Sequence, residues 1–143
     1  GTEINAVFRW DDFKIFLGYT HADVEENTIG GVESAPLVPK DRLNSVFVYE
    51  REDDIRIGLE AYYYGRQELT SGAKSRDYWI FGLMIEKIFS DKFSLFINFE
   101  NFTDTRQTRY GSINSGTLAS PIFADIFAPL DGYVANGGIK LRF

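Results

Sequence analysis

Apolar and polar residues alternate with a period of two along most of this 143-residue chain. Successive side chains of an extended strand point to opposite faces, so this period is typical of β-strands and not of amphipathic helices. Seven segments show the pattern, over residues 3–10, 13–23, 42–50, 55–66, 77–89, 92–102 and 133–143. We therefore predict an all-β fold, an antiparallel up-and-down meander of about seven strands.

Short and long connections alternate strictly between these segments. They have two, eighteen, four, ten, two and thirty residues, at 11–12, 24–41, 51–54, 67–76, 90–91 and 103–132. Tight turns on one side and long loops on the other are typical of outer-membrane β-barrels. No apolar run approaches the roughly 20 residues of a transmembrane helix. We therefore interpret the seven segments as strands of a transmembrane β-barrel.

Aromatic residues mark the two ends of the more apolar face. They are Trp10, Phe13, Tyr49, Phe93 and Phe143 at the short-turn end, and Tyr19, Tyr63, Trp79, Phe99 and Tyr133 at the long-loop end. Barrels carry such aromatic girdles at both interfaces of the membrane. A soluble, lipocalin-like ligand-binding barrel with its apolar face inside would alternate in the same way, and it stays open as an alternative.

Seven strands would place the two ends of the chain on opposite sides of the membrane. Complete single-chain bacterial barrels have an even number of strands. Unpaired strand edges in lipid would cost several kcal/mol per backbone group. We therefore expect part of a larger barrel. The alternative is an eighth strand within 112–130, near Pro121–Ile126, which would give a stand-alone eight-stranded barrel, structural or lipid-modifying.

Composition excludes several other classes of function. The net charge of −6 disfavours a nucleic-acid partner. The chain has no cysteine, which excludes disulfides, thiolate metal sites and cysteine nucleophiles. His21 is the single histidine, and we interpret it as a rim residue rather than a base or iron ligand. We predict no enzyme, no catalytic residue, no metal site and no cofactor.

Two stretches carry a resemblance to a known family. The segment Phe93–Asp104, ending in Asn101-Phe-Thr-Asp104, continues into Arg106, Arg109 and Tyr110. It resembles the penultimate strand and last loop of TonB-dependent outer-membrane receptors. The stretch 136–143 is similar to the final strand of that family. The resemblance implies that Ile139, Leu141 and Phe143 form the assembly signal that the barrel-assembly machinery reads.

The resemblance implies a 22-stranded barrel with an N-terminal plug. Such receptors import ferric siderophores, vitamin B12, haem, metals or glycans with energy delivered by TonB. Residues 1–143 would be the C-terminal segment of the barrel in a bacterial outer membrane, without plug or TonB box and inactive alone. Its partners would be outer-membrane lipid, the remaining barrel and plug, the assembly machinery, TonB only through the plug, and a ferric siderophore or similar iron chelate.

The long connections hold the candidate ligand-binding residues Arg76, Arg106, Arg109 and Tyr110. Cations beside aromatic rings suit an anionic aromatic ligand such as a ferric catecholate. They suit lipopolysaccharide or a salt-bridged loop equally well. Three further carboxylates, Asp23, Glu25 and Glu26, could bind Ca²⁺, but we interpret them as solvated loop charge.

The more polar face carries opposite charges on neighbouring segments. Arg56 and Glu86 lie near the short-turn end of adjacent segments, so we predict a cross-strand contact between them. Lys140 and Arg142 lie at the same level of the last segment. We expect these charges to pair within the barrel wall or with the plug.

Overall fold

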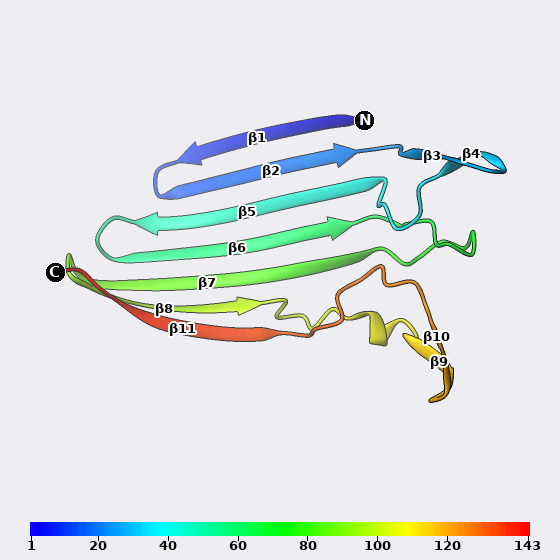
Figure 1. Cartoon of the computed structure of the whole chain (residues 1–143). Helices are drawn as coiled ribbons and strands as arrows, with labels where there is room; N and C mark the ends of the chain where they lie inside the picture. Colours follow the sequence, from blue (N-terminus) through cyan, green and yellow to red (C-terminus); the bar gives the residue numbers. More distant parts are fainter.

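One antiparallel sheet of seven strands dominates the computed structural model, which describes residues 1–143 (Figure 1). The strands are β1 Thr2–Trp10, β2 Phe13–His21, β5 Asp41–Arg51, β6 Ile55–Tyr64, β7 Tyr78–Ser90, β8 Phe93–Glu100 and β11 Val134–Leu141. Their order in the sheet is their order in the chain. This confirms the predicted all-β meander, because the period-two pattern marked each of the seven strands.

The remaining elements lie in the long connections. Two small hairpins extend beyond the sheet, β3 Glu25–Thr28 with β4 Gly31–Ser34, and β9 Asn114–Thr117 with β10 Ser120–Phe123. A 3-10 helix, η1, covers Gln107–Arg109. No helix is long and apolar enough to cross a membrane. The suggested eighth strand is thus half right, since residues 120–123 form a strand, but it pairs only with β9 and does not join the large sheet.

Continuous pairing sorts the side chains onto two faces. Directly opposed residues share a face, and the face changes at every residue along a strand. Arg56 lies directly opposite Glu86, as predicted. The one register shift in the sheet falls between Ile88 and Ser90 at the end of β7. We call the face with Arg56 and Glu86 the polar face and the opposite one the apolar face.

The apolar face has no cover. Only 13 of 143 residues are buried, and the hydrophobic ones among them are Tyr78 and Ala128. Trp10 is 75% exposed and Phe8 58% exposed. The sheet is also open, because β1 and β11 each have a single neighbouring strand. The chain therefore lacks the enclosed apolar core that the soluble-barrel alternative requires.

Two of the three short turns contain an aspartate in the left-handed conformation. Asp11 has a φ of 46° and Asp53 a φ of 55°. Aspartate is one of the few residues besides glycine that adopts this region at moderate cost. These turns connect β1 with β2 and β5 with β6. They set the register in which the charges of neighbouring strands face each other.

Gly137 lies where β11 closely approaches β8, and Gly58 in β6 lies in a more open position. A Cβ at Gly137 would lie 2.8 Å from the carbonyl oxygen of Phe96, whereas a Cβ at Gly58 would meet nothing closer than 3.8 Å. We expect Gly137→Ala to lower the free energy of unfolding by about 1–3 kcal/mol. Gly58→Ala should leave it unchanged or raise it by up to about 1 kcal/mol. Denaturant titration of both variants measures the difference, and equal effects would contradict the packing described here.

Candidate functional site

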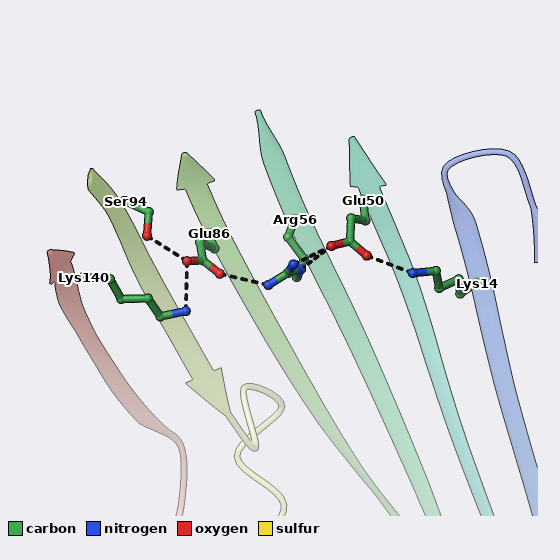
Figure 2. Close-up of polar contacts among 6 residues, drawn as sticks. All are labelled: Lys14, Glu50, Arg56, Glu86, Ser94 and Lys140. Carbon is green, nitrogen blue, oxygen red and sulfur yellow. Dashed lines mark hydrogen bonds and ion pairs between the residues drawn. The ribbon is translucent and has the colours of Figure 1, made fainter. Parts of the chain in front are cut away.

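A row of alternating charges crosses the polar face near the short turns (Figure 2). We call Lys14, Glu50, Arg56, Glu86 and Lys140 the charge row. Lys14 Nζ lies 2.9 Å from Glu50 Oε2, and Arg56 Nε donates to Glu50 Oε1 over 2.9 Å. Arg56 Nη1 reaches Glu86 Oε2 at 3.3 Å, and Lys140 Nζ lies 2.8 Å from Glu86 Oε1. The row thus links β2, β5, β6, β7 and β11 in one network.

Glu86 is the most enclosed member of the charge row. Its side chain is 6% exposed, and it also accepts a hydrogen bond of 2.8 Å from the Ser94 hydroxyl. An enclosed carboxylate is stable only when charged partners and donors surround it. Glu86 has three such partners, Ser94 and Lys140 on Oε1 and Arg56 on Oε2. The predicted contacts of Arg56 and Lys140 with this wall are confirmed, while Arg142 forms no ion pair.

The loop end of the polar face contains a tyrosine-lined cavity. Its volume is about 350 Å³, and it is lined by Arg42, Tyr62 and Tyr64 together with Glu3, Thr20, Leu43, Asn44 and Tyr63. The ring of Tyr64 stacks on Tyr78 with 5.0 Å between centroids. Arg42 lies among these rings and forms no ion pair. An aromatic surface beside a guanidinium that has no ion-pair partner can bind a planar or anionic group.

Side-chain amides fold the last long connection, residues 101–133, into a fixed shape. Asn101 Nδ2 donates to Thr105 O over 2.9 Å, and Asn101 Oδ1 accepts from the Thr105 amide over 2.9 Å. Gln107 is 3% exposed and binds three backbone groups. It donates to Asp125 O over 2.6 Å and accepts from the amides of Phe127 and Ala128 over 2.7 and 3.1 Å.

The same connection is tied to the loop between β6 and β7. Asp125 Oδ2 accepts from the Thr70 amide over 2.7 Å. The carbonyl of Phe127 accepts from Gln67 Nε2 over 3.0 Å and from the Tyr78 hydroxyl over 2.9 Å. These contacts join the two loops above β7 into one packed unit.

Three of the predicted ligand-binding residues lie in this unit with their side chains engaged. Arg106 Nη2 and Arg109 Nη2 both bind Asp104 Oδ2, at 2.9 and 2.6 Å. The ring of Tyr110 stacks on Phe127 at 6.2 Å. Arg76, in the β6–β7 loop, forms no ion pair. A ligand role for the four residues stays a prediction, and Arg76 is the one cation among them without a carboxylate partner.

The predicted assembly residues lie at the free edge of the sheet. Ile139 and Leu141 point from β11 to the apolar face and are 64% and 60% exposed. Phe143 follows the strand and is fully exposed. This placement leaves all three side chains accessible. Their recognition by an assembly machinery stays a prediction.

Polar pairs lie at both ends of the apolar face. At the loop end, His21 Nδ1 lies 2.8 Å from Asp41 Oδ1, and the Tyr19 hydroxyl donates to the same oxygen over 2.6 Å. At the turn end, Asp54 pairs with Lys87 and Arg51. The rim interpretation of His21 thus agrees with its position at the end of β2.

Asp23, Glu25 and Glu26 stand close together in sequence at the start of the first long loop. Asp23 Oδ1 lies 2.5 Å from Lys40 Nζ, and this ammonium lowers the pKa of the Asp23 carboxyl. Glu25 and Glu26 belong to β3. The structure contains no convergent group of His, Asp or Glu side chains that could hold a metal ion.

Sequence reasoning missed several residues of these sites. Glu50 could have been found, because it lies directly opposite Arg56 across a short turn. Arg42, Tyr62 and Tyr64 also share a face by parity. Gln107 carried no such signal, since its partners are backbone groups of a loop without periodicity.

Comparison with known proteins supplies a fold relationship. No family model matches the chain, and no curated protein sequence matches it significantly. The structure is similar to a variant of the ferric enterobactin receptor PfeA from Pseudomonas aeruginosa, with a TM-score of 0.74, 19% identity, and coverage of 99% of this chain and 22% of the receptor. A second variant, in complex with enterobactin, gives 0.66 and 22% identity over 96% of this chain and 22% of the receptor.

Both neighbours are ferric enterobactin receptors with a β-barrel fold. The present chain spans about a fifth of their length. At 19–22% identity the similarity establishes the fold. The seven-stranded sheet therefore has the fold of a segment of such a barrel, which confirms at the level of fold the resemblance found in the sequence.

Removal of the Gln107 side-chain amide should loosen the last loop. In Gln107→Leu the amides of Phe127 and Ala128 and the carbonyl of Asp125 lose their partner. Each unsatisfied buried group costs about 1–3 kcal/mol. We expect faster hydrogen exchange at the Phe127 and Ala128 amides. Gln107→Glu keeps both acceptor contacts and should retain more protection at these two amides, and identical exchange in the two variants would argue against this anchoring role.

Proposed function

We propose that residues 1–143 form the C-terminal part of the barrel wall of a TonB-dependent receptor in a bacterial outer membrane. The observation that carries the proposal is an open antiparallel sheet with an uncovered apolar face and a charged, networked polar face. Lipid on one side and a water-filled or plugged lumen on the other fit these two faces. The fold similarity to receptor barrels supports the same interpretation.

The apolar face has the height of a membrane. Trp79 and Phe89 both lie on this face of β7, ten positions apart. At about 3.3 Å per residue they are separated by about 33 Å along the strand. A tilt of about 40° reduces this to about 25 Å, which is the apolar height of outer-membrane barrels. The polar pairs of His21 and Asp54 lie near the two borders of this zone.

In this proposal the free edges of β1 and β11 pair with further strands of the barrel. Such pairing satisfies backbone groups that would otherwise face lipid. The partners are outer-membrane lipid, the remaining barrel and its plug, and an assembly machinery that reads Ile139, Leu141 and Phe143. TonB would act through the plug. The wall itself contributes binding and not catalysis.

The cargo we propose is a ferric siderophore or a similar iron chelate. Arg76 and Arg42 are cations without carboxylate partners at the loop end of the sheet. Tyr62 and Tyr64 line a cavity with Arg42, and Tyr110 lies in the last loop at the same end. This chemistry suits an anionic aromatic chelate. The similar receptor from Pseudomonas aeruginosa carries a related ligand in its name, ferric enterobactin.

We expect the chain to fold only where an apolar environment, such as a detergent micelle, covers its apolar face. We expect β-type circular dichroism in detergent micelles and aggregation without them, because Trp10, Phe8 and their neighbours have no other cover. Edges left unpaired should keep the detergent-bound chain oligomeric. A monomer that folds in plain buffer would contradict the proposal. A compact monomer with heat-dependent gel mobility would favour a complete small barrel instead.

Binding of ferric enterobactin by the whole receptor tests the proposed cargo site. We expect Arg76→Gln to weaken affinity about three- to ten-fold, since this guanidinium has no carboxylate partner. Arg109→Gln should weaken it less, because Arg109 is already bound to Asp104. Lys92→Gln, at the opposite end of the sheet, is the control and should have no effect. An unchanged affinity in Arg76→Gln would exclude this residue from the site.

A further inference from the structure

A second cavity at the loop end of the sheet borders the apolar face. Its volume is about 390 Å³, within the range of ligand-binding sites. Asp41 at the start of β5 and Tyr63 of β6 line it, and both side chains belong to the apolar face by parity. Asp77, which follows the same parity beyond Trp79 of β7, lines it as well. We call this space the rim cavity.

Two loops form the walls of the rim cavity, and backbone hydrogen bonds hold them together. The Leu37 amide of the first long loop donates to the carbonyl of Glu68 in the β6–β7 loop over 2.8 Å. The Gly65 amide donates to the Asp41 carbonyl over 2.8 Å, and a Cβ at Gly65 would lie 2.9 Å from that oxygen. The first long loop contributes apolar side chains to the lining, those of Ala22, Val24, Ala35 and Val38.

Three charged side chains of the β6–β7 loop line the rim cavity without partners. Arg66, Glu68 and Lys74 form no ion pair and no side-chain hydrogen bond. Glu68 lies directly opposite Lys74 in an isolated β-bridge, outside ion-pair distance. Charges of opposite sign therefore line one cavity without neutralising each other.

The other ionic groups of the rim cavity are engaged. Lys40 pairs with Asp23, and Asp41 pairs with His21. The Asp77 carboxylate accepts a hydrogen bond of 3.2 Å from a tyrosine hydroxyl. The groups left to meet a ligand are thus two cations and one carboxylate of the β6–β7 loop.

This set of unpaired groups disfavours ligands that carry charge of one sign. A simple anion would be repelled by Glu68, and a simple cation would be repelled by Arg66 and Lys74. A zwitterion satisfies all three, because its anionic group binds the two cations and its ammonium binds the carboxylate.

The floor of the rim cavity continues into the aromatic part of the apolar face. The ring centroids of Tyr63 and Trp79 are 5.1 Å apart, and Trp79 stacks on Phe81 at 5.8 Å. Trp79 is 39% exposed. Tyrosine and tryptophan rings gather at the level of lipid headgroups in membrane proteins. A ligand with an apolar tail can therefore place its charged group in the cavity and its tail over these rings.

We propose that the rim cavity binds the headgroup of a membrane lipid that carries both a phosphate and an ammonium group. This inference rests on the proposed function, which makes the apolar face the lipid-facing one. The phosphate would bind Arg66 and Lys74, the ammonium would bind Glu68, and the acyl chains would lie along Trp79 and Phe81. A lipid fits better than a soluble zwitterion, because the cavity opens onto an exposed apolar surface.

The test follows the fluorescence of Trp79 in the chain folded in detergent micelles. Trp10 and Trp79 are the two tryptophans, so Trp10→Phe leaves one reporter beside the cavity. The quenchers are phosphatidylethanolamine and phosphatidylglycerol with the same nitroxide on one acyl chain. They share the phosphate, but only phosphatidylethanolamine carries the ammonium. We expect saturable quenching, with phosphatidylethanolamine bound about three- to five-fold more tightly. Equal quenching by the two lipids would overturn the proposal.

Variants of the cavity locate the site. Arg66→Gln/Lys74→Gln should weaken binding of phosphatidylethanolamine about ten-fold. Glu68→Gln should abolish the preference for phosphatidylethanolamine over phosphatidylglycerol. The matched control is Lys92→Gln/Arg142→Gln, which removes two cations without ion pairs at the opposite end of the sheet and should change affinity less than about two-fold. An equal loss in this control, or no loss in the cavity variants, would overturn the proposal.

The free headgroup distinguishes a lipid from a soluble ligand. Glycerophosphoethanolamine has the same phosphate and ammonium without acyl chains. It should displace the labelled lipid only at about a hundred-fold higher concentration or more, because it lacks the contacts of the tail. Displacement at equal concentration would overturn the lipid assignment in favour of a soluble zwitterion. The proposed function fails separately, if the chain folds as a monomer without detergent.

Discussion

The hydrogen-bonded ladder of the sheet is the interaction on which the rest of this structure depends. Of 81 backbone hydrogen bonds, 63 lie within strands, while almost no side chain is buried. A soluble domain of this size would enclose an apolar core, but here the ladder orders the chain and leaves one face uncovered. The environment must therefore supply what a core supplies elsewhere. The proposed membrane location follows from that requirement.

The same ladder positions the charges of the polar face. Arg56 and Glu86 are direct partners because β6 and β7 pair continuously from Ile55–Lys87 to Tyr64–Tyr78. A register shift of one residue would move Glu86 to the apolar face. The network therefore forms only in the correct register, since five charges from five strands meet only when every strand pairing is the observed one. Ion pairing here adds specificity to a sheet that has no core to select its register.

Sequence periodicity predicted this sheet well because each strand places apolar and polar residues at alternate positions, on opposite faces. The Arg56–Glu86 contact was predictable for the same reason, since both residues lie near the short-turn end of adjacent strands and share a face by parity. The fold of residues 101–133 was not predictable. Gln107 binds backbone groups 18–21 positions away, and such contacts leave no periodic trace. The strand at 120–123 overlaps the suggested region near Pro121–Ile126, but nothing in its residues showed that it would pair only with its neighbour β9.

The packed loops limit how selectivity could arise at the loop end. Gln67 and Asp125 hold the β6–β7 loop and the last loop together through backbone contacts. Gln107 fixes the last loop through that loop's own backbone. A unit of this kind presents its side chains in fixed positions, so in the proposed receptor the choice of ligand would depend on which cations lack a carboxylate partner. Asp104 neutralises part of the charge of Arg106 and Arg109, whereas Arg76 and Arg42 have no such partner. Arg76 and Arg42, rather than the paired Arg106 and Arg109, are therefore the cations that would distinguish one anionic chelate from another.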